Sequence, residues 1–370
     1  MTQADHPAGQ AGPVAGLRIP RLIGLQSEDD PNERWQRTRA DILRKISVAI
    51  GPLPPPVPPE PKIVFTEELD DGNLIRQSIR YRSFDDDEVS AYLLYPSHVA
   101  TEAHGACPAM IALHQTVPQG KEAVAGLQGD PDDRYGLELA GRGYAVLVPD
   151  VLTAGDRIYP GFPPYCTRPF EEKYPHWSMI GKMIYDHRQG LELLAGLEWV
   201  DKRRIGAIGH SLGAYNAYFL AAFDERVRAV VASCGFYPFA GDSYPLRWGR
   251  REFTHIPELN RWLERGEVPF EFHEVAAAIA PRAYFNWSAQ SDEHYGNWQS
   301  IGTAMLALQE VYEALGVPDR FVSIIAPGGH RFSPFARACA YQWLDCQLKG
   351  VDSFSDSRGL KRLKQTKNGG

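Results

Sequence analysis

A serine between two glycines lies in the middle of the chain, in residues 204–217, RIGAIGHSLGAYNA. Ser211 stands between Gly209 and Gly213, where an apolar run gives way to an alanine-rich run. We interpret the first run as a strand and the second as a helix. A strand that turns sharply into a helix strains the backbone of the turning residue, and only small neighbours leave room for the turn. The spacing therefore predicts a nucleophile elbow that presents the hydroxyl group of Ser211.

A serine hydroxyl becomes an effective nucleophile when a nearby base removes its proton. His330 follows the last apolar strand, in IIAPGGHRF, where two glycines allow the loop to carry the imidazole towards Ser211. An acid is expected after the preceding strand, in PRAYFNWSAQSD, and Asp292 is the first candidate. Its neighbour Glu293 is an alternative, and Asp242 is a third choice. The acid would fix the imidazole tautomer and stabilise the imidazolium that forms.

The oxyanion of an acyl-transfer intermediate needs N–H donors. The backbone N–H of Leu212, at the start of the expected helix, is one candidate. The second is expected in ALHQTVPQG, after an early buried strand, from either Gln115 or Thr116. His114 would shape this loop. A metal site at His114 is not expected, because no second potential ligand stands near it in the sequence.

Two irregular segments are expected to surround the substrate. One is rich in aromatic residues, TAGDRIYPGFPPYCTRPFEEKYPHW, and the other is FYPFAGDSYPLRWGRREF. A long aromatic loop at the carboxyl edge of a sheet suits a lid or a sugar platform, although packing of the loop on itself explains its composition equally well. The candidate substrate-lining residues are His114, Tyr159, Trp177, Phe236 and Tyr237.

Apolar strands alternate with amphipathic helices along most of the chain, which predicts a mostly parallel sheet of about eight strands with helices on both faces. The first two strands, IRQSIRYRS and EVSAYLLYP, are expected to form a hairpin. The expected organisation is a loosely ordered segment at 1–28, a helix and proline-rich crossing at 29–62, a catalytic domain at 63–350 with lid-like loops near 153–178 and 236–280, and a polar basic tail at 351–370.

Composition excludes several classes of protein. The 370 residues carry a net charge of −7, from 39 basic and 46 acidic residues, which argues against a nucleic-acid surface. Five scattered cysteines form no CxxC pair and suggest neither a disulfide framework nor a zinc site. No signal peptide and no membrane span is visible, so we expect a soluble cytoplasmic protein. The expected mechanism requires no cofactor.

The motifs together resemble the α/β-hydrolase superfamily, and within it the dienelactone-hydrolase and acetyl-xylan-esterase-like branch with a serine nucleophile. The resemblance rests on EWVDKRRIGAIGHSLGA, IALHQT, PRAYFNWSAQSD and PGGHRF. It implies an α/β-hydrolase fold and a carboxylic ester substrate, for example an acetylated sugar. Several positions depart from the family pattern, among them Gln115, Leu212, Ala214 and Ala289. Gln115 stands where glycine is usual, and Leu212 stands where glucuronoyl esterases carry an arginine, which counts against that specificity.

Other functions remain open at this level. The same three residues could serve a serine peptidase or an acyltransferase, and the fold could be a binding protein without catalysis. A dinucleotide-binding enzyme is disfavoured because no GxGxxG follows an early strand. The sequence also leaves open whether the protein is a homo-oligomer.

Overall fold

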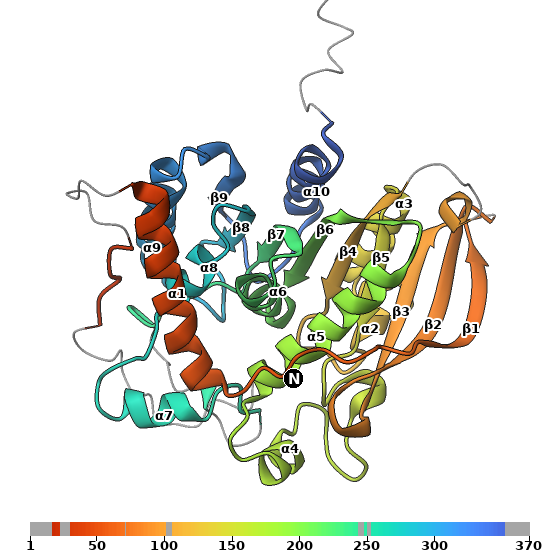
Figure 1. The fold of residues 1–370 in the computed structure, drawn as a ribbon, viewed down its shortest axis with the longest axis horizontal. Coiled ribbons are helices and arrows are strands. Elements are labelled where there is room, and N and C mark those ends of the chain that lie inside the picture. The colour runs from red at the N-terminus through yellow and green to blue at the C-terminus, as the bar shows by residue number, and fades with distance from the viewer. Residues whose placement is uncertain are drawn as a thin grey trace, which may run out of the picture.

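A nine-stranded sheet runs through the whole molecule in the order β1-β2-β3-β5-β4-β6-β7-β8-β9 (Figure 1). The computed structural model describes residues 17–22, 30–70, 72–100, 106–242, 248–249 and 253–351. The strands are β1 (Lys62–Leu69), β2 (Leu74–Arg82), β3 (Glu88–Pro96), β4 (Cys107–Leu113), β5 (Ala145–Pro149), β6 (Val200–His210), β7 (Val227–Ser233), β8 (Ala283–Ala289) and β9 (Phe321–Ala326).

The sheet is antiparallel at one edge and parallel elsewhere. Strands β1, β2, β3 and β5 pair antiparallel in turn, and all pairs from β5 through β4 to β9 are parallel. This confirms the predicted α/β-hydrolase fold with its mostly parallel sheet. The sheet has nine strands where about eight were expected, and the additional strand is β1. β1 contains three consecutive apolar residues, Ile63, Val64 and Phe65, and all three are exposed. The strand shows neither the alternation nor the longer apolar run by which buried strands are recognised.

Helices cover both faces of the sheet within the described residues. They are α1 (Pro31–Ile50), α2 (Lys121–Val124), α3 (Tyr135–Gly141), α4 (Arg168–Lys173), α5 (Met179–Gly196), α6 (Leu212–Phe223), α7 (Glu258–Leu263), α8 (Phe272–Ala277), α9 (Trp298–Ala314) and α10 (Pro334–Lys349). Residues of α1, α5, α6, α8 and α9 contribute to one hydrophobic core, and residues of α2, α3 and α10 contribute to a second.

The central strand β4 shows how the sequence supplies both cores. Ile111 and Leu113 belong to the first core, whereas Met110 and Ala112 belong to the second, and all four are fully buried. Side chains alternate between the two faces of a strand, so a strand buried on both faces must be apolar throughout. The continuous apolar run of β4 therefore places it in the middle of the domain.

The N-terminal helix and the proline-rich segment both pack on this domain. Trp35 of α1 donates a hydrogen bond from its indole N–H to the carbonyl of Ala280 (3.2 Å). In the crossing at 51–61, the N–H of Val57 donates to the side chain of Gln189 (3.0 Å) on α5. The predictions for residues 1–16, 23–28 and 352–370 lie outside the described residues.

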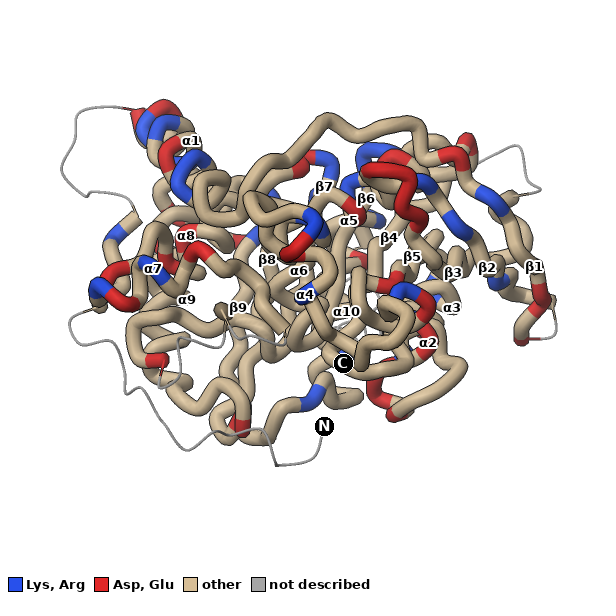
Figure 2. The backbone as a smooth tube through the Cα atoms, turned by 90° about the horizontal axis from the view of Figure 1, so that it is seen from below, with Lys and Arg blue, Asp and Glu red and all other residues tan. Residues whose placement is uncertain are grey.

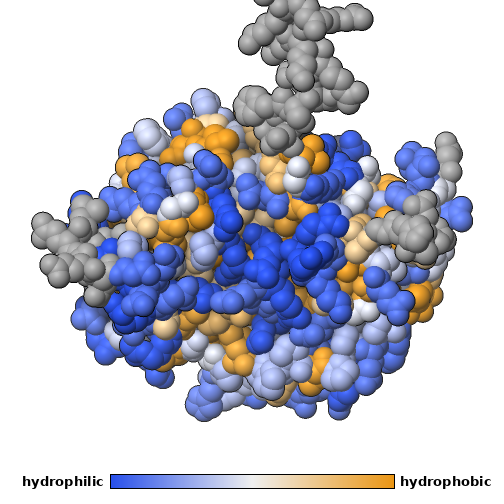
Figure 3. Space-filling model, turned by 45° about the horizontal axis from the view of Figure 1, so that its top comes forward, coloured by the Kyte–Doolittle hydropathy of each residue, from blue (hydrophilic) through white to orange (hydrophobic). Residues whose placement is uncertain are grey.

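Helices α4 and α7 both lie at the lower side of the molecule (Figure 1), on the side where the parallel strands end. Figure 2 looks onto this side and shows acidic residues around α2 and the segment that follows it. On the opposite side, the surface is largely hydrophilic with separate hydrophobic patches (Figure 3). None of the described helices combines the length and apolarity needed to cross a membrane.

Ser211 occupies a strained turn between β6 and α6. Its φ and ψ angles are 53° and −116°, a combination outside the usual allowed regions that costs about 1–3 kcal/mol. A Cβ atom on Gly209 would lie 2.2 Å from the backbone of Gly213, and one on Gly213 would lie 1.8 Å from the carbonyl oxygen of Leu113. The two glycines therefore permit α6 to start directly against β4 and β6.

This close approach yields a test of the elbow. Replacing Gly213 by alanine should lower the free energy of unfolding by about 2–3 kcal/mol, because the new methyl group overlaps backbone that cannot move freely. Gly141→Ala is the matched control, since no atom lies within 4 Å of its added Cβ and the change should stay within about 0.5 kcal/mol. Urea unfolding measures both. Equal stability of the two variants would contradict the described packing.

Candidate active site

Three candidate residues, and a cysteine beside them, lie at the carboxyl ends of neighbouring parallel strands. Ser211 follows β6, Cys234 follows β7, Asp292 follows β8 by three residues, and His330 follows β9 by four. Ligand sites of open α/β sheets lie at this edge, because loops from several strands converge there. Strand order alone thus brings together residues that are more than a hundred positions apart in the sequence.

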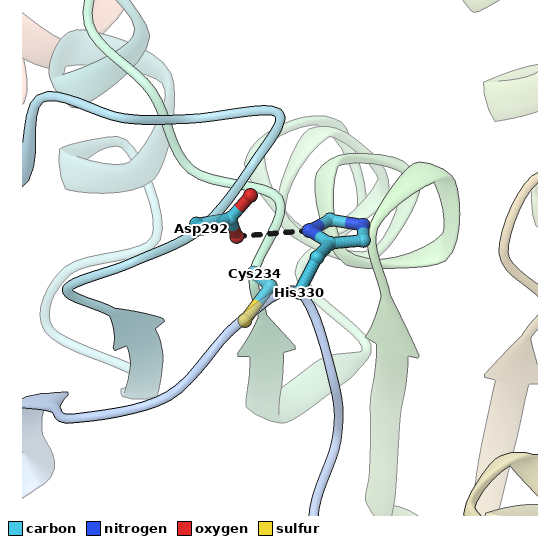
Figure 4. A group of neighbouring side chains, drawn as sticks. All are labelled: Cys234, Asp292 and His330. Atoms are coloured by element: carbon cyan, nitrogen blue, oxygen red, sulfur yellow. Dashed lines mark hydrogen bonds and ion pairs between the residues drawn. The ribbon is translucent and has the colours of Figure 1, made fainter. Parts of the chain in front are cut away.

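His330 and Asp292 form a direct hydrogen bond (Figure 4). Nδ1 of His330 lies 2.8 Å from Oδ2 of Asp292. The other carboxylate oxygen of Asp292 accepts the backbone N–H groups of His294 (2.9 Å) and Tyr295 (3.0 Å). With Nδ1 as the donor to the carboxylate, Nε2 of His330 is left as the acceptor nitrogen of the neutral ring.

The environment of Asp292 favours its charged form. Burial opposes ionisation, but the hydrogen bond and charge of His330 and the two backbone N–H donors outweigh it, and the pKa of Asp292 is lowered. The neighbouring Glu293 has a different contact. Its carboxylate accepts the backbone N–H of His330 at 3.0 Å. Of the three acid candidates, Asp292 therefore contacts the imidazole, and Glu293 holds the loop that carries it. Asp242 is buried in the segment after β7.

Other rings surround His330. The rings of His210 and His294 lie 4.8 Å and 4.6 Å from it, and that of Tyr295 lies 5.6 Å away. His210 lines the same cavity as Ser211. Burial, with a smaller contribution from His330, lowers the pKa of His210 to about 3, so its ring stays neutral near His330.

A cavity of about 280 Å³ contains both Ser211 and His330. The other residues that line it are Gln115, Thr116, Val117, Asp130, Asp132, Asp133, His210, His294, Arg331 and Phe332. Most of these side chains are polar or charged, which suits a ligand rich in hydrogen-bonding groups rather than a long acyl chain.

Asp130, Asp132 and Asp133 form an acidic wall of the cavity that was not predicted from the sequence. Arg331, the residue after His330, forms ion pairs with Asp130 (3.3 Å) and Asp132 (2.9 Å) of this wall. The stretch DPDDR carries an acidic signal, but it precedes Arg331 by some two hundred positions. A local pattern cannot reveal a contact over that separation.

The loop after β4 is held by its own buried side chains. His114 is fully buried, with Nδ1 2.7 Å from the carbonyl oxygen of Gln115 and Nε2 accepting the N–H of Val151 (3.1 Å). The Gln115 carbonyl also accepts the N–H of Val117 (2.8 Å) and the hydroxyl of Tyr165 (3.3 Å).

The peptide that joins Gln115 to Thr116 fixes the direction of one N–H group. In a trans peptide the C=O and the following N–H point in opposite directions. The N–H of Thr116 is therefore directed away from the donors that hold the Gln115 carbonyl.

The five predicted substrate-lining residues are not among the described residues that line this cavity. Trp177 packs instead in an aromatic cluster with Phe84, whose ring centroid is 5.2 Å away. His114, Phe236 and Tyr237 are buried, and Tyr159 packs against the hydrophobic core. For the segment near 153–178, the aromatic composition therefore reflects packing of the segment on the domain, which was the alternative interpretation.

One group of described side chains has the spacing of metal ligands. The ligand atoms of Cys234, Asp292 and His330 lie within 4.8 Å of one another (Figure 4). Burial and the charge of Asp292 raise the pKa of the Cys234 thiol to about 12, so the thiolate that a metal would need is disfavoured. A metal would also compete for the Asp292–His330 hydrogen bond. The donor set fits a hydrogen-bonded pair better than a metal site.

Comparison with known proteins supports the α/β-hydrolase fold described above. The sequence matches the family model described as "Alpha/beta hydrolase family" over residues 124–349. A relative named "Putative hydrolase YtaP", from Bacillus subtilis (strain 168), is 24% identical over 302 residues, which cover 79% of this chain and 94% of the relative.

Solved structures share the same architecture. A glucuronoyl esterase from Solibacter usitatus matches with a TM-score of 0.69 at 18% identity, over 90% of this chain and 98% of the other. A structure described as a "putative acetyl xylan esterase" from Bacteroides fragilis matches with a TM-score of 0.63 at 18% identity, over 83% of this chain and 79% of the other. At these identities the similarity establishes a common fold.

The acidic wall makes stability depend on pH. Burial, with the charges of Asp130 and Asp132, raises the pKa of Asp133 from 3.8 to about 6. The folded state thus holds this proton more tightly than the unfolded state, and the free energy of unfolding falls as pH rises from about 4 through 6. The pKa shift of Asp133 corresponds to a loss of roughly 3 kcal/mol in the free energy of unfolding at most. Because Asp133 is partly exposed, solvent screening reduces this loss to about 1 kcal/mol.

Asp133→Asn should therefore raise the free energy of unfolding by about 1 kcal/mol at pH 7.5, and most of this gain should vanish at pH 4.5. Urea unfolding of wild type and variant at both pH values provides the measurement. A gain of the same size at both pH values would show that ionisation of Asp133 is not the cause.

Proposed function

The chain belongs to the alpha/beta hydrolase family, and we propose that it is a serine carboxylesterase that acts through an acyl-enzyme intermediate. The observation that carries the proposal is the strained Ser211, which shares one cavity with a histidine that is hydrogen-bonded to a carboxylate. A nucleophile, a base and an acid that orients the base are the parts that acyl transfer requires.

In the proposed reaction, Oγ of Ser211 attacks the carbonyl carbon of the ester while Nε2 of His330 takes the hydroxyl proton. Asp292 holds the ring through Nδ1 and stabilises its positive charge. The tetrahedral intermediate then expels the alcohol, which receives the proton from His330. Water attacks the acyl-serine by the same route, releases the carboxylic acid and restores Ser211.

Two backbone N–H groups are proposed to bind the oxyanion. Leu212 begins α6, so its N–H belongs to the first turn, where helical N–H groups have no acceptor within the helix. Thr116 lines the cavity and supplies the second donor. Donors of this kind act because they are already in place when the charge develops.

The proposed substrate is an ester of a neutral sugar, such as an acetylated one. The polar cavity supports this choice, and so do the structural neighbours, which are described as a glucuronoyl esterase and a "putative acetyl xylan esterase". The acidic wall disfavours an anionic substrate such as a free uronic acid. The side chain of Leu212 is fully buried and offers no charge to such a group.

The kinetic test uses p-nitrophenyl acetate. Wild-type protein should hydrolyse it with turnover, and Ser211→Ala should lower kcat by roughly 10³-fold or more, as expected on removal of a triad nucleophile. Assays with an added alcohol and with a peptide anilide separate the esterase from an acyltransferase and a peptidase. A folded wild-type protein as slow as Ser211→Ala would overturn the proposal.

The neighbouring acids Asp292 and Glu293 allow a matched comparison. Asp292→Asn should lower kcat by about 10²–10⁴-fold, because an amide no longer fixes the reactive tautomer of His330. Glu293→Gln should remain within about threefold of wild type, since an amide oxygen can still accept the N–H of His330. The reverse order of effects would assign the triad acid to Glu293.

A further inference from the structure

Gln115 is one of the residues that line the cavity together with Ser211, and the mechanism does not use its side chain. The residue is 6% exposed. Neither its Nε2 nor its Oε1 atom has a hydrogen-bond partner among the described residues. Buried polar atoms are normally paired, because an unpaired one loses its bonds to water without replacement. An unpaired carboxamide on a residue of the cavity wall therefore points to a ligand.

The backbone of Gln115 is too constrained to move the side chain elsewhere. Its carbonyl oxygen is surrounded by Nδ1 of His114, the N–H of Val117 and the hydroxyl of Tyr165. The terminal torsion of a glutamine is soft, however, so the carboxamide can turn towards a bound molecule at small cost. The carboxamide of Gln115 is thus fixed in position, but its N–H and C=O groups can change direction.

A carboxamide offers two N–H donors and one acceptor oxygen. Two adjacent hydroxyl groups match this set, because one can accept from Nε2 while the other donates to Oε1. The neighbouring wall also suits hydroxyl donors, since Asp130, Asp132 and Asp133 supply carboxylate oxygens. An oxyanion would match less well, because it would use Nε2 and leave Oε1 unpaired close to a negative charge.

We propose that Gln115 is a specificity-determining residue that binds a pair of adjacent hydroxyl groups on the alcohol part of the ester. The inference rests on the proposed esterase function and narrows its substrate class to esters of vicinal diols, including sugars. A site built to pair with a hydroxyl group rejects the analogue that lacks it, because the polar groups of the protein are then buried unpaired.

Two acetate esters that share one ring test the inference: cyclohexyl acetate and its 2,3-dihydroxy derivative. Wild-type protein should prefer the dihydroxy ester by at least about tenfold in kcat/KM, mainly through KM. Gln115→Leu should lower kcat/KM for the dihydroxy ester by about 10–100-fold and leave that for cyclohexyl acetate within about threefold. Gln128→Leu, the same substitution at an exposed position outside the cavity, should change neither.

The outcomes separate this inference from the proposed function. Two outcomes would overturn the inference and leave the esterase proposal intact, provided that wild type hydrolyses cyclohexyl acetate. One is that wild type shows no preference for the dihydroxy ester, and the other is that Gln115→Leu lowers kcat/KM equally for both esters. An unchanged preference in Gln115→Leu would also overturn it, as expected if an ordered water satisfies the amide. Inactivity of folded wild type on both esters and on p-nitrophenyl acetate would remove the esterase proposal and the inference with it.

Discussion

The contact between Gly213 and the carbonyl oxygen of Leu113 is the constraint on which the rest of the site depends. No side chain fits at Gly213, and so α6 starts directly against the end of β4. This approach keeps Ser211 in its strained conformation and brings the start of α6 beside the loop that contains Gln115 and Thr116. The energy that holds the serine comes from the packing of the two hydrophobic cores, as is common for strain at functional sites.

Charge and hydrogen bonding then set the second half of the site. Burial alone would favour a neutral Asp292, but His330 and two backbone N–H groups keep it ionised. The next residue, Arg331, binds the acidic wall that follows α2. The loop that carries the imidazole is therefore tied both to the residues after β8 and to the acidic side of the cavity, which restricts the movement of the ring.

Local patterns were sufficient for the fold and for part of the site. The apolar strands, the glycines around Ser211 and the loop glycines before His330 are short-range features, and they predicted the α/β fold and the residues that converge at the sheet edge. The edge strand β1 was missed because its three apolar residues neither alternate with polar ones nor form a long run. The acidic wall depends on contacts between distant segments. The aromatic residues near 153–178 were ambiguous because packing and binding favour the same side chains.

The most direct test of the account is reaction of the intact protein with a fluorophosphonate, followed by peptide mapping by mass spectrometry. Such reagents phosphonylate a serine whose hydroxyl is activated by a neighbouring base. The account predicts one phosphonyl group per chain, on Ser211, with strong loss of labelling when His330 is replaced by alanine. Labelling at another residue, or none on folded protein, would contradict the assignment of Ser211 as the nucleophile.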